Sequence, residues 1–183
     1  MGTASANDAT LNGTAANAFG CQAGWNPQAG QNGDTSGFGT AFDSFGTDAW
    51  SLLGKKDGNA PFSRTGPLSF TLTGTSNGGT WTVTNTGSTT TTAVADLVFA
   101  LHAGDQGGAW LFDNRMIAAG QTLSGTWQMN WTVGQGNNNN PDFSNATIFG
   151  RGEGVTSPVP EPATYGMLLA GLGLVGAIAR RRS

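Results

Sequence analysis

The sequence predicts an all-β fold, in which an antiparallel, jelly-roll-like β-sandwich body is followed by a single C-terminal transmembrane helix. Two observations predict the sandwich: apolar residues alternate with Thr or Ser in several short segments, and clusters of Gly and Asn separate these segments. A third observation predicts the helix, because residues 163–179 are apolar and carry no charge. With 30 glycines and only 10% charged residues, the composition of the 183-residue chain is typical of short strands joined by turns.

The strand pattern is clearest between residues 68 and 84. Apolar residues alternate with Ser or Thr at 68–73 and again at 80–84, and an Asn-Gly-Gly turn sequence at 77–79 separates them, which predicts a β-hairpin. Residues 93–102 form a longer apolar run, which predicts a central strand covered on much of both faces. Further strands are predicted at 109–117, 125–133 and 146–149, with Trp81, Trp127 and Trp131 filling the core.

The chain divides into four parts. Residues 1–46 are rich in Gly, Asn, Ala and Gln without a helical or strand period, so we expect a loop-rich segment. Its scattered aromatic residues predict that it docks partly on the body. Residues 47–150 form the predicted β-sandwich domain, 151–158 a linker, and 159–183 a C-terminal segment with its own organisation.

The C-terminal segment has the layout of a membrane span with an extended approach. The 17 residues of 163–179 rise roughly 25 Å as a helix, slightly less than a hydrocarbon core of about 30 Å. Arg180, Arg181 and Arg182 favour the cytoplasmic side, which places the body across the membrane. Pro160 and Pro162 keep the preceding peptide extended, where an enzyme can read it. These physical arguments alone are equally compatible with a permanent anchor.

This segment resembles a known sorting signal. Val159-Pro160-Glu161-Pro162, followed by Ala163-Thr164-Tyr165, a Leu/Gly/Ala run and the arginine cluster, is similar to the PEP-CTERM signal of Gram-negative bacteria. The resemblance implies that an exosortase, a membrane-embedded cysteine transpeptidase, recognises Pro160-Glu161-Pro162 and removes the tail. It also implies a transient inner-membrane tether with a periplasmic body, then delivery to the cell surface or an extracellular polysaccharide or biofilm matrix.

The N-terminus bears on the same route. Residues 1–6 have neither a basic start nor an apolar core, whereas Ala4-Ser5-Ala6 has the small-x-small form that signal peptidase leaves. We therefore expect the sequence to begin near the mature terminus, after removal of an export signal.

Charge and cysteine content exclude some classes of function. Residues 1–158 carry five basic and ten acidic residues, a net charge of −5, with no basic patch for phosphates, so nucleic acid binding is not expected. The only cysteine, Cys21, permits no internal disulfide. The Cys21 thiol is therefore either buried, oxidised or in a disulfide with another chain.

The candidates for catalysis and metal binding are few. His102 is the only histidine, no Gly-x-Ser-x-Gly elbow accompanies it, and its predicted place is mid-strand, so we expect a structural role. Calcium at Asp105 and Asp113 is chemically possible because hard cations take oxygen ligands, but the spacing is not that of an EF-hand loop. We expect that the protein is not an enzyme, and that it has no cofactor and no dedicated metal site. A hydrolytic acid pair would have to be drawn from Asp96, Asp105, Asp113, Asp142 and Glu153.

A binding function has one set of candidates. Tryptophan faces offer apolar platforms to sugars, and Trp25, Trp50 and Trp110 are the tryptophans not assigned to the core. The alternative to a structural surface protein is therefore a secreted carbohydrate-binding or hydrolytic module.

Overall fold

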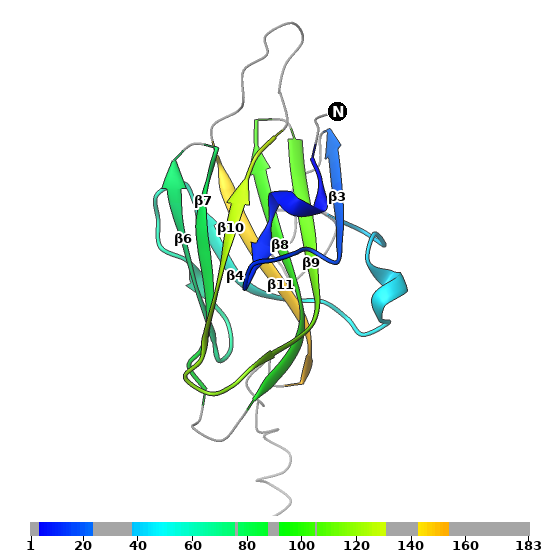
Figure 1. Cartoon of the computed structure of the whole chain (residues 1–183), viewed down its shortest axis with the longest axis vertical. Helices are drawn as coiled ribbons and strands as arrows, with labels where there is room; N and C mark the ends of the chain where they lie inside the picture. The colour runs from blue at the N-terminus through cyan, green and yellow to red at the C-terminus, as the bar shows by residue number, and fades with distance from the viewer. Residues whose placement is uncertain are drawn as a thin grey trace, which may run out of the picture.

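Two antiparallel β-sheets face each other in the body. The computed structural model describes residues 4–23, 38–75, 77–87, 92–104, 106–130 and 143–153, and Figure 1 shows the two layers that they form. The predicted all-β antiparallel sandwich is confirmed. No helix in these described ranges is long and apolar enough to cross a membrane, and the helix predicted at 163–179 lies outside them.

The small sheet contains the predicted hairpin. Its strands lie in the order β10-β7-β6, with bounds Thr122–Gln128 for β10, Gly78–Asn85 for β7 and Leu68–Thr75 for β6. Leu68, Trp81 and Leu123 point inward and are buried, whereas the alternate positions carry Thr or Ser. The predicted strand at 125–133 begins earlier and ends at Gln128; Trp131 lies outside the described residues.

The large sheet has six strands, and the predicted central strand is third among them. The order is β3 (Ala18–Ala23), β9 (Gln106–Ile117), β8 (Ala93–Ala103), β11 (Asn145–Glu153), β4 (Ser51–Asp57) and β5 (Ser63–Arg64). From 97 to 101, every residue of β8 is fully buried, so both faces of this strand are covered as its continuous apolar run predicted.

The inner face of β8 packs against the small sheet. Phe99 stacks on Trp81 with ring centroids 4.7 Å apart and planes 5° from parallel. The Trp81 indole N–H donates to the Thr10 carbonyl at 2.9 Å, so its polar atom has a partner. Burying an aromatic or aliphatic side chain of this size stabilises the fold by about 1.5–3 kcal/mol.

The outer face of the large sheet is covered by residues 38–50, which we call the covering segment. Phe38 and Phe42 pack over Val98 and Ala100 of β8, and the Phe38 ring meets Phe149 of β11 edge-on at 5.2 Å. A short 3₁₀ turn, η3 (Asp43–Phe45), lies within this segment. The small side chains of β8 leave room for these rings, so the aromatic residues of the N-terminal third dock on the body as expected.

The first 23 residues are more regular than the sequence predicted. After the 3₁₀ turn η1 (Ala6–Asp8), strands β1 (Thr10–Leu11) and β2 (Thr14–Ala15) form a tight hairpin beside β10. Asn12 and Gly13 have φ angles of 51° and 72°, as a two-residue hairpin turn requires. Strand β3 then pairs with β9 at the edge of the large sheet, where the sequence had predicted a loop-rich segment.

Replacing Gly125 by Ala tests the packing of β1 on β10. A Cβ at this position would clash with the Thr10 carbonyl oxygen and lie 2.6 Å from the Trp81 Nε1. We predict that Gly125→Ala lowers the free energy of unfolding by about 1–3 kcal/mol in urea denaturation. The control is Ser124→Ala at the exposed neighbouring position, which should change it by less than about 0.5 kcal/mol. Equal effects of both variants would contradict the packing.

Candidate functional site

A β-bulge on the outer face of the large sheet gathers most of its buried charge. The register of β8 and β9 shifts between Ala95 and Leu97, so Asp96 alone lies opposite Asp113 and Asn114. Asn114 has a φ of 50°, and its backbone N–H donates to the Asp96 carboxylate at 2.9 Å. Bulges of this kind redirect side chains and often lie beside functional sites.

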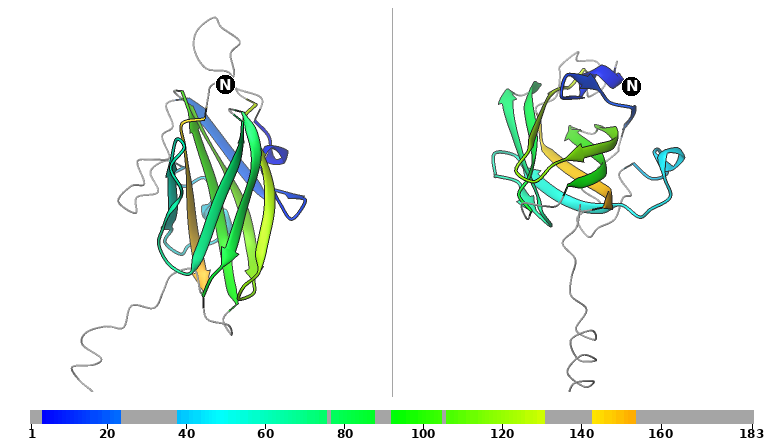
Figure 2. Two further views of the ribbon diagram at one scale, coloured as in Figure 1. Left: turned by 90° about the vertical axis from the view of Figure 1, so that its left-hand side faces the viewer. Right: turned by 60° about the horizontal axis from the view of Figure 1, so that its bottom comes forward.

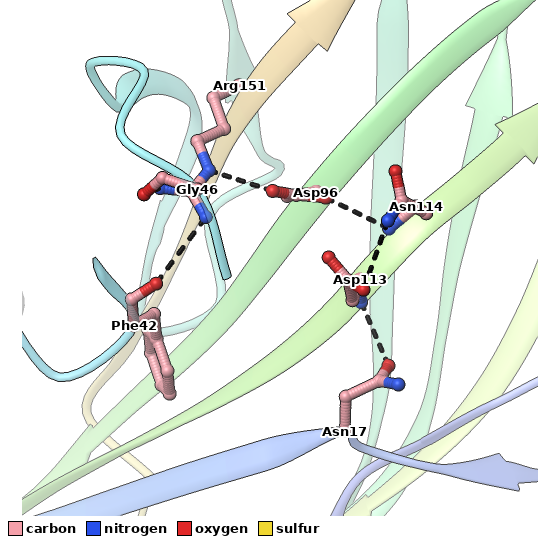
Figure 3. Close-up of polar contacts among 7 residues, drawn as sticks. All are labelled: Asn17, Phe42, Gly46, Asp96, Asp113, Asn114 and Arg151. Carbon is pink, nitrogen blue, oxygen red and sulfur yellow. Dashed lines mark hydrogen bonds and ion pairs between the residues drawn. The ribbon is translucent and has the colours of Figure 1, made fainter. Parts of the chain in front are cut away.

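Arg151 joins this bulge to the covering segment. Its Nε donates to the Asp96 carboxylate at 2.8 Å, and the two side chains are only 3% and 13% exposed. Its terminal nitrogens reach the carbonyls of Gly46 and Phe42 (Figure 3). Its guanidinium lies 4.2 Å from the centre of the Trp50 ring. One buried cation therefore binds β8, β11 and the covering segment together.

The pKa values of the two aspartates of the bulge are shifted in opposite directions. Burial, followed by the neighbouring Asp96 carboxylate, raises the pKa of Asp113 above its ordinary value. Burial by itself also raises the pKa of Asp96, but the Asn114 backbone N–H and the side chains of Arg151 and Asp113 together lower it below its ordinary value. The Asp113 Oδ1 atom is buried and has no hydrogen-bond partner among the described residues.

Asp96 and Asp113 are both candidates for the acid pair of a glycoside hydrolase. Hydrolytic carboxyl pairs stand about 5–9.5 Å apart so that a sugar, or a sugar and a water, fits between them. In this structure Asp96 is held by Arg151 and by the backbone N–H of Asn114. A cavity of about 320 Å³ opens beside Asp96 and Arg151, where their charges compensate each other.

Neither Trp50 nor Trp110, the two described tryptophans proposed for glycan contact, is a free platform. Trp110 is fully buried and donates its indole N–H to the Ser5 carbonyl at 2.9 Å, so the expectation that it is exposed was wrong. The reason is that β9 lies between β3 and β8 and is covered on both faces. Trp50 is half-buried between the Arg151 guanidinium and the edge of Phe38, and Trp25 lies outside the described residues.

The remaining candidates have separate locations. His102 lies near the end of β8, half-buried, with its Nδ1 3.2 Å from the Asn145 side-chain amide. Asp105 lies outside the described residues. The calcium hypothesis for Asp105 and Asp113 therefore stays a prediction. Cys21 lies on β3 and packs partly against the inner core, where burial raises the pKa of its thiol.

A second cavity lies at the open end of the sandwich. This end pocket, of about 430 Å³, lies between the loop after β4 and the β6–β7 turn. Phe143 and Leu72 supply apolar surface, and Asn59, Lys56 and Thr75 supply polar groups. Its size and lining suit a small polar ligand such as a sugar unit. Its parts come from four separate segments, which is why the sequence did not predict it.

The sorting residues Val159 to Pro162 and Arg180 to Arg182 lie outside the described ranges, and comparison with known families identifies the segment that contains them. A family model for the PEP-CTERM protein-sorting motif matches residues 158–183. The resemblance found in the sequence is thereby confirmed, and the motif marks the chain for export and processing by an exosortase. Searches of the curated proteins and of the solved structures gave no match.

Replacing Arg151 tests how much its contacts stabilise the fold. Arg151→Met leaves Asp96 buried without its partner, and we predict a loss of about 3–5 kcal/mol in the free energy of unfolding. The control is Lys55→Met, which removes the surface ion pair with Asp57 and should cost less than about 1 kcal/mol. We also expect faster proteolysis within residues 38–50 in Arg151→Met alone. A loss no greater than that of the control would contradict the proposed clamp.

Asp113→Asn and Asp96→Asn should change the free energy of unfolding in opposite directions as the pH rises. Asp113 has a raised pKa, so its contribution to stability is present below the unfolded pKa of about 4 and is lost as the pH rises through the folded value. Asp113→Asn should therefore become more stable relative to wild type from pH 3 towards neutrality. Asp96 has a lowered pKa and stabilises the folded state above about pH 4, so Asp96→Asn should become less stable over the same range. Parallel curves for the two variants, measured by urea denaturation, would refute this assignment.

Proposed function

We propose that this chain is the precursor of a non-enzymatic surface protein, whose β-sandwich body is released from a transient membrane tether into the extracellular matrix. The observation that carries the proposal is the match of residues 158–183 to the PEP-CTERM sorting motif. In this account residues 163–179 form the transmembrane helix and the arginines at 180–182 hold its cytoplasmic end. The exosortase cuts at Pro160-Glu161-Pro162, and the body passes from the periplasmic side to the cell surface.

Features of the body support a role in the matrix. Its described residues are held together by two apolar clusters and one buried cation, so the fold does not depend on the tail. Asp96, one of the candidate acids, forms a buried ion pair with Arg151. We propose that the body acts by association, with exopolysaccharide as its partner and no cofactor.

A secreted carbohydrate-binding module is the second candidate, and the end pocket favours it. If the pocket holds a sugar unit, Phe143→Ala removes the aromatic surface beside Asn59 and Lys56 and should weaken binding about tenfold or more. Tryptophan fluorescence is a suitable readout, because the Phe143 ring lies 5.7 Å from that of Trp127. Titration with neutral oligosaccharides that leaves the fluorescence unchanged would remove this candidate.

Processing tests the proposed function directly. The precursor, with an export signal, would be expressed in hosts with and without an exosortase, and the body would be weighed by intact mass spectrometry. We predict a C-terminus near residues 160–162 only where the enzyme is present. The triple variant Pro160→Ala/Glu161→Ala/Pro162→Ala should stay unprocessed, whereas Ser157→Ala, outside the motif, should be processed normally. A body that keeps Arg180 to Arg182 in both hosts would identify an ordinary membrane-anchored protein.

A further inference from the structure

The outward face of the small sheet carries one kind of side chain. Over residues 68–73, 80–84 and 122–126, strands β6, β7 and β10 alternate between inward-facing residues and outward-pointing Thr or Ser. This sheet faces the viewer in the left view of Figure 2. The outward residues of these ranges, which we call the threonine face, are Ser69, Thr71, Thr73, Thr80, Thr82, Thr84, Thr122, Ser124 and Thr126. Thr75, Gly78 and Gln128 continue the outward positions at one end of the sheet.

The strand register arranges these nine residues as three rows of three. Ser69, Thr84 and Thr122 form one row, Thr71, Thr82 and Ser124 the next, and Thr73, Thr80 and Thr126 the third. Neighbouring positions lie about 4.8 Å apart across the strands and about 6.7 Å apart along them. The hydroxyls therefore form a two-dimensional lattice with a constant repeat.

Each row contains a hydroxyl pair that keeps hydrogen-bonding capacity for an external partner. The Thr71–Thr82 and Thr73–Thr80 oxygens are 2.7 Å apart, and those of Thr84 and Thr122 are 2.8 Å apart. A pair of hydroxyls uses one proton and one lone pair between them, so one proton and three lone pairs remain. The pairing also fixes the orientation of the side chains before any partner binds, which lowers the entropy lost on binding.

The threonine face is unusual because it lacks charge. Threonine suits an exposed strand, and cross-strand Thr pairs stabilise a sheet, so these two effects account for the residue type. They do not account for the absence of Lys, Arg, Asp and Glu from all of β6, β7 and β10, of which β6 is an edge strand of its sheet. Edge strands normally carry charge as protection against unwanted pairing. The described strands of the large sheet do carry it, for example at Lys55, Asp57 and Arg64.

We propose that the threonine face binds a neutral, hydroxyl-rich polysaccharide chain laid across the sheet. This inference rests on the proposed function and names the chemistry of the matrix partner. A repeating polymer of sugar hydroxyls matches a repeating lattice of donors and acceptors, whereas an acidic polysaccharide would require cations that the face does not have. A protein partner would use the aromatic and Arg anchors typical of interfaces, and no position of the threonine face supplies one.

The test is binding of the purified full chain in detergent to immobilised polysaccharides. The neutral probes are a glucan, a mannan, a galactan and a xylan, and the acidic probes are alginate and pectate. We expect binding to at least one neutral polymer and to neither acidic one, with an affinity that does not change with salt concentration, because no ion pairs are formed. Binding to the acidic polymers that weakens with salt, or no binding to any neutral polymer, would overturn the proposal.

Matched variants locate the site. Thr71→Val/Thr80→Val/Thr82→Val keeps the β-branched shape and removes three hydroxyls, and it should weaken binding at least about tenfold. Thr71→Ser/Thr80→Ser/Thr82→Ser keeps the hydroxyls and should stay within about threefold of wild type. Circular dichroism would show that both variants are folded.

The outcomes separate this proposal from the others. Full affinity in the valine variant, or loss of binding in Phe143→Ala but not in the valine variant, would assign the polysaccharide to the end pocket and overturn a role for the threonine face. Absence of exosortase cleavage would refute the sorting function while leaving the binding data intact. Normal cleavage without any neutral polysaccharide binding would refute the threonine face alone.

Discussion

Strand β8 must be covered on both of its faces, and most of the body follows from that requirement. Its inner side chains meet the small sheet through the Phe99–Trp81 stack, and its outer side chains are too small to fill the space above them alone. Phe38 and Phe42 fill this space, which makes residues 38–50 part of the fold rather than a connection. A strand buried in this way has no tolerance for unpaired polar groups.

The one place where β8 carries a charge shows how the requirement is met. Asp96 lies at the bulge, where the backbone N–H of Asn114 donates a hydrogen bond and Arg151 supplies the opposite charge. The same guanidinium makes a cation–π contact with the ring of Trp50 and donates hydrogen bonds to carbonyls of the covering segment. The buried ion pair therefore does not merely satisfy its own charges: it determines where the covering segment lies.

Local periodicity predicted the β6–β7 hairpin, the central place of β8 and the position of β11. It failed for β3, because Ala18–Ala23 has no alternation and becomes a strand only by pairing with β9, which is distant in the sequence. The Asn12-Gly13 turn was a usable signal for the β1–β2 hairpin, but its strands are only two residues long. The role of Arg151 depends on a bulge that strands β8 and β9 form together. The burial of Trp110 depends on the strands on both sides of β9. Local sequence patterns could therefore predict neither.

The protein joins a β-sandwich, whose outward small-sheet face is uncharged, to a C-terminal signal that directs its export. We expect the body to fold independently of the tail. Hydrogen exchange, compared between the membrane-bound precursor and the protein released by exosortase, tests this most directly. We expect the amides of residues 98–101 in β8 to exchange most slowly, and at the same rate in both forms. Faster exchange of these amides after release would show that the tail or the membrane supports the fold, and would contradict the account.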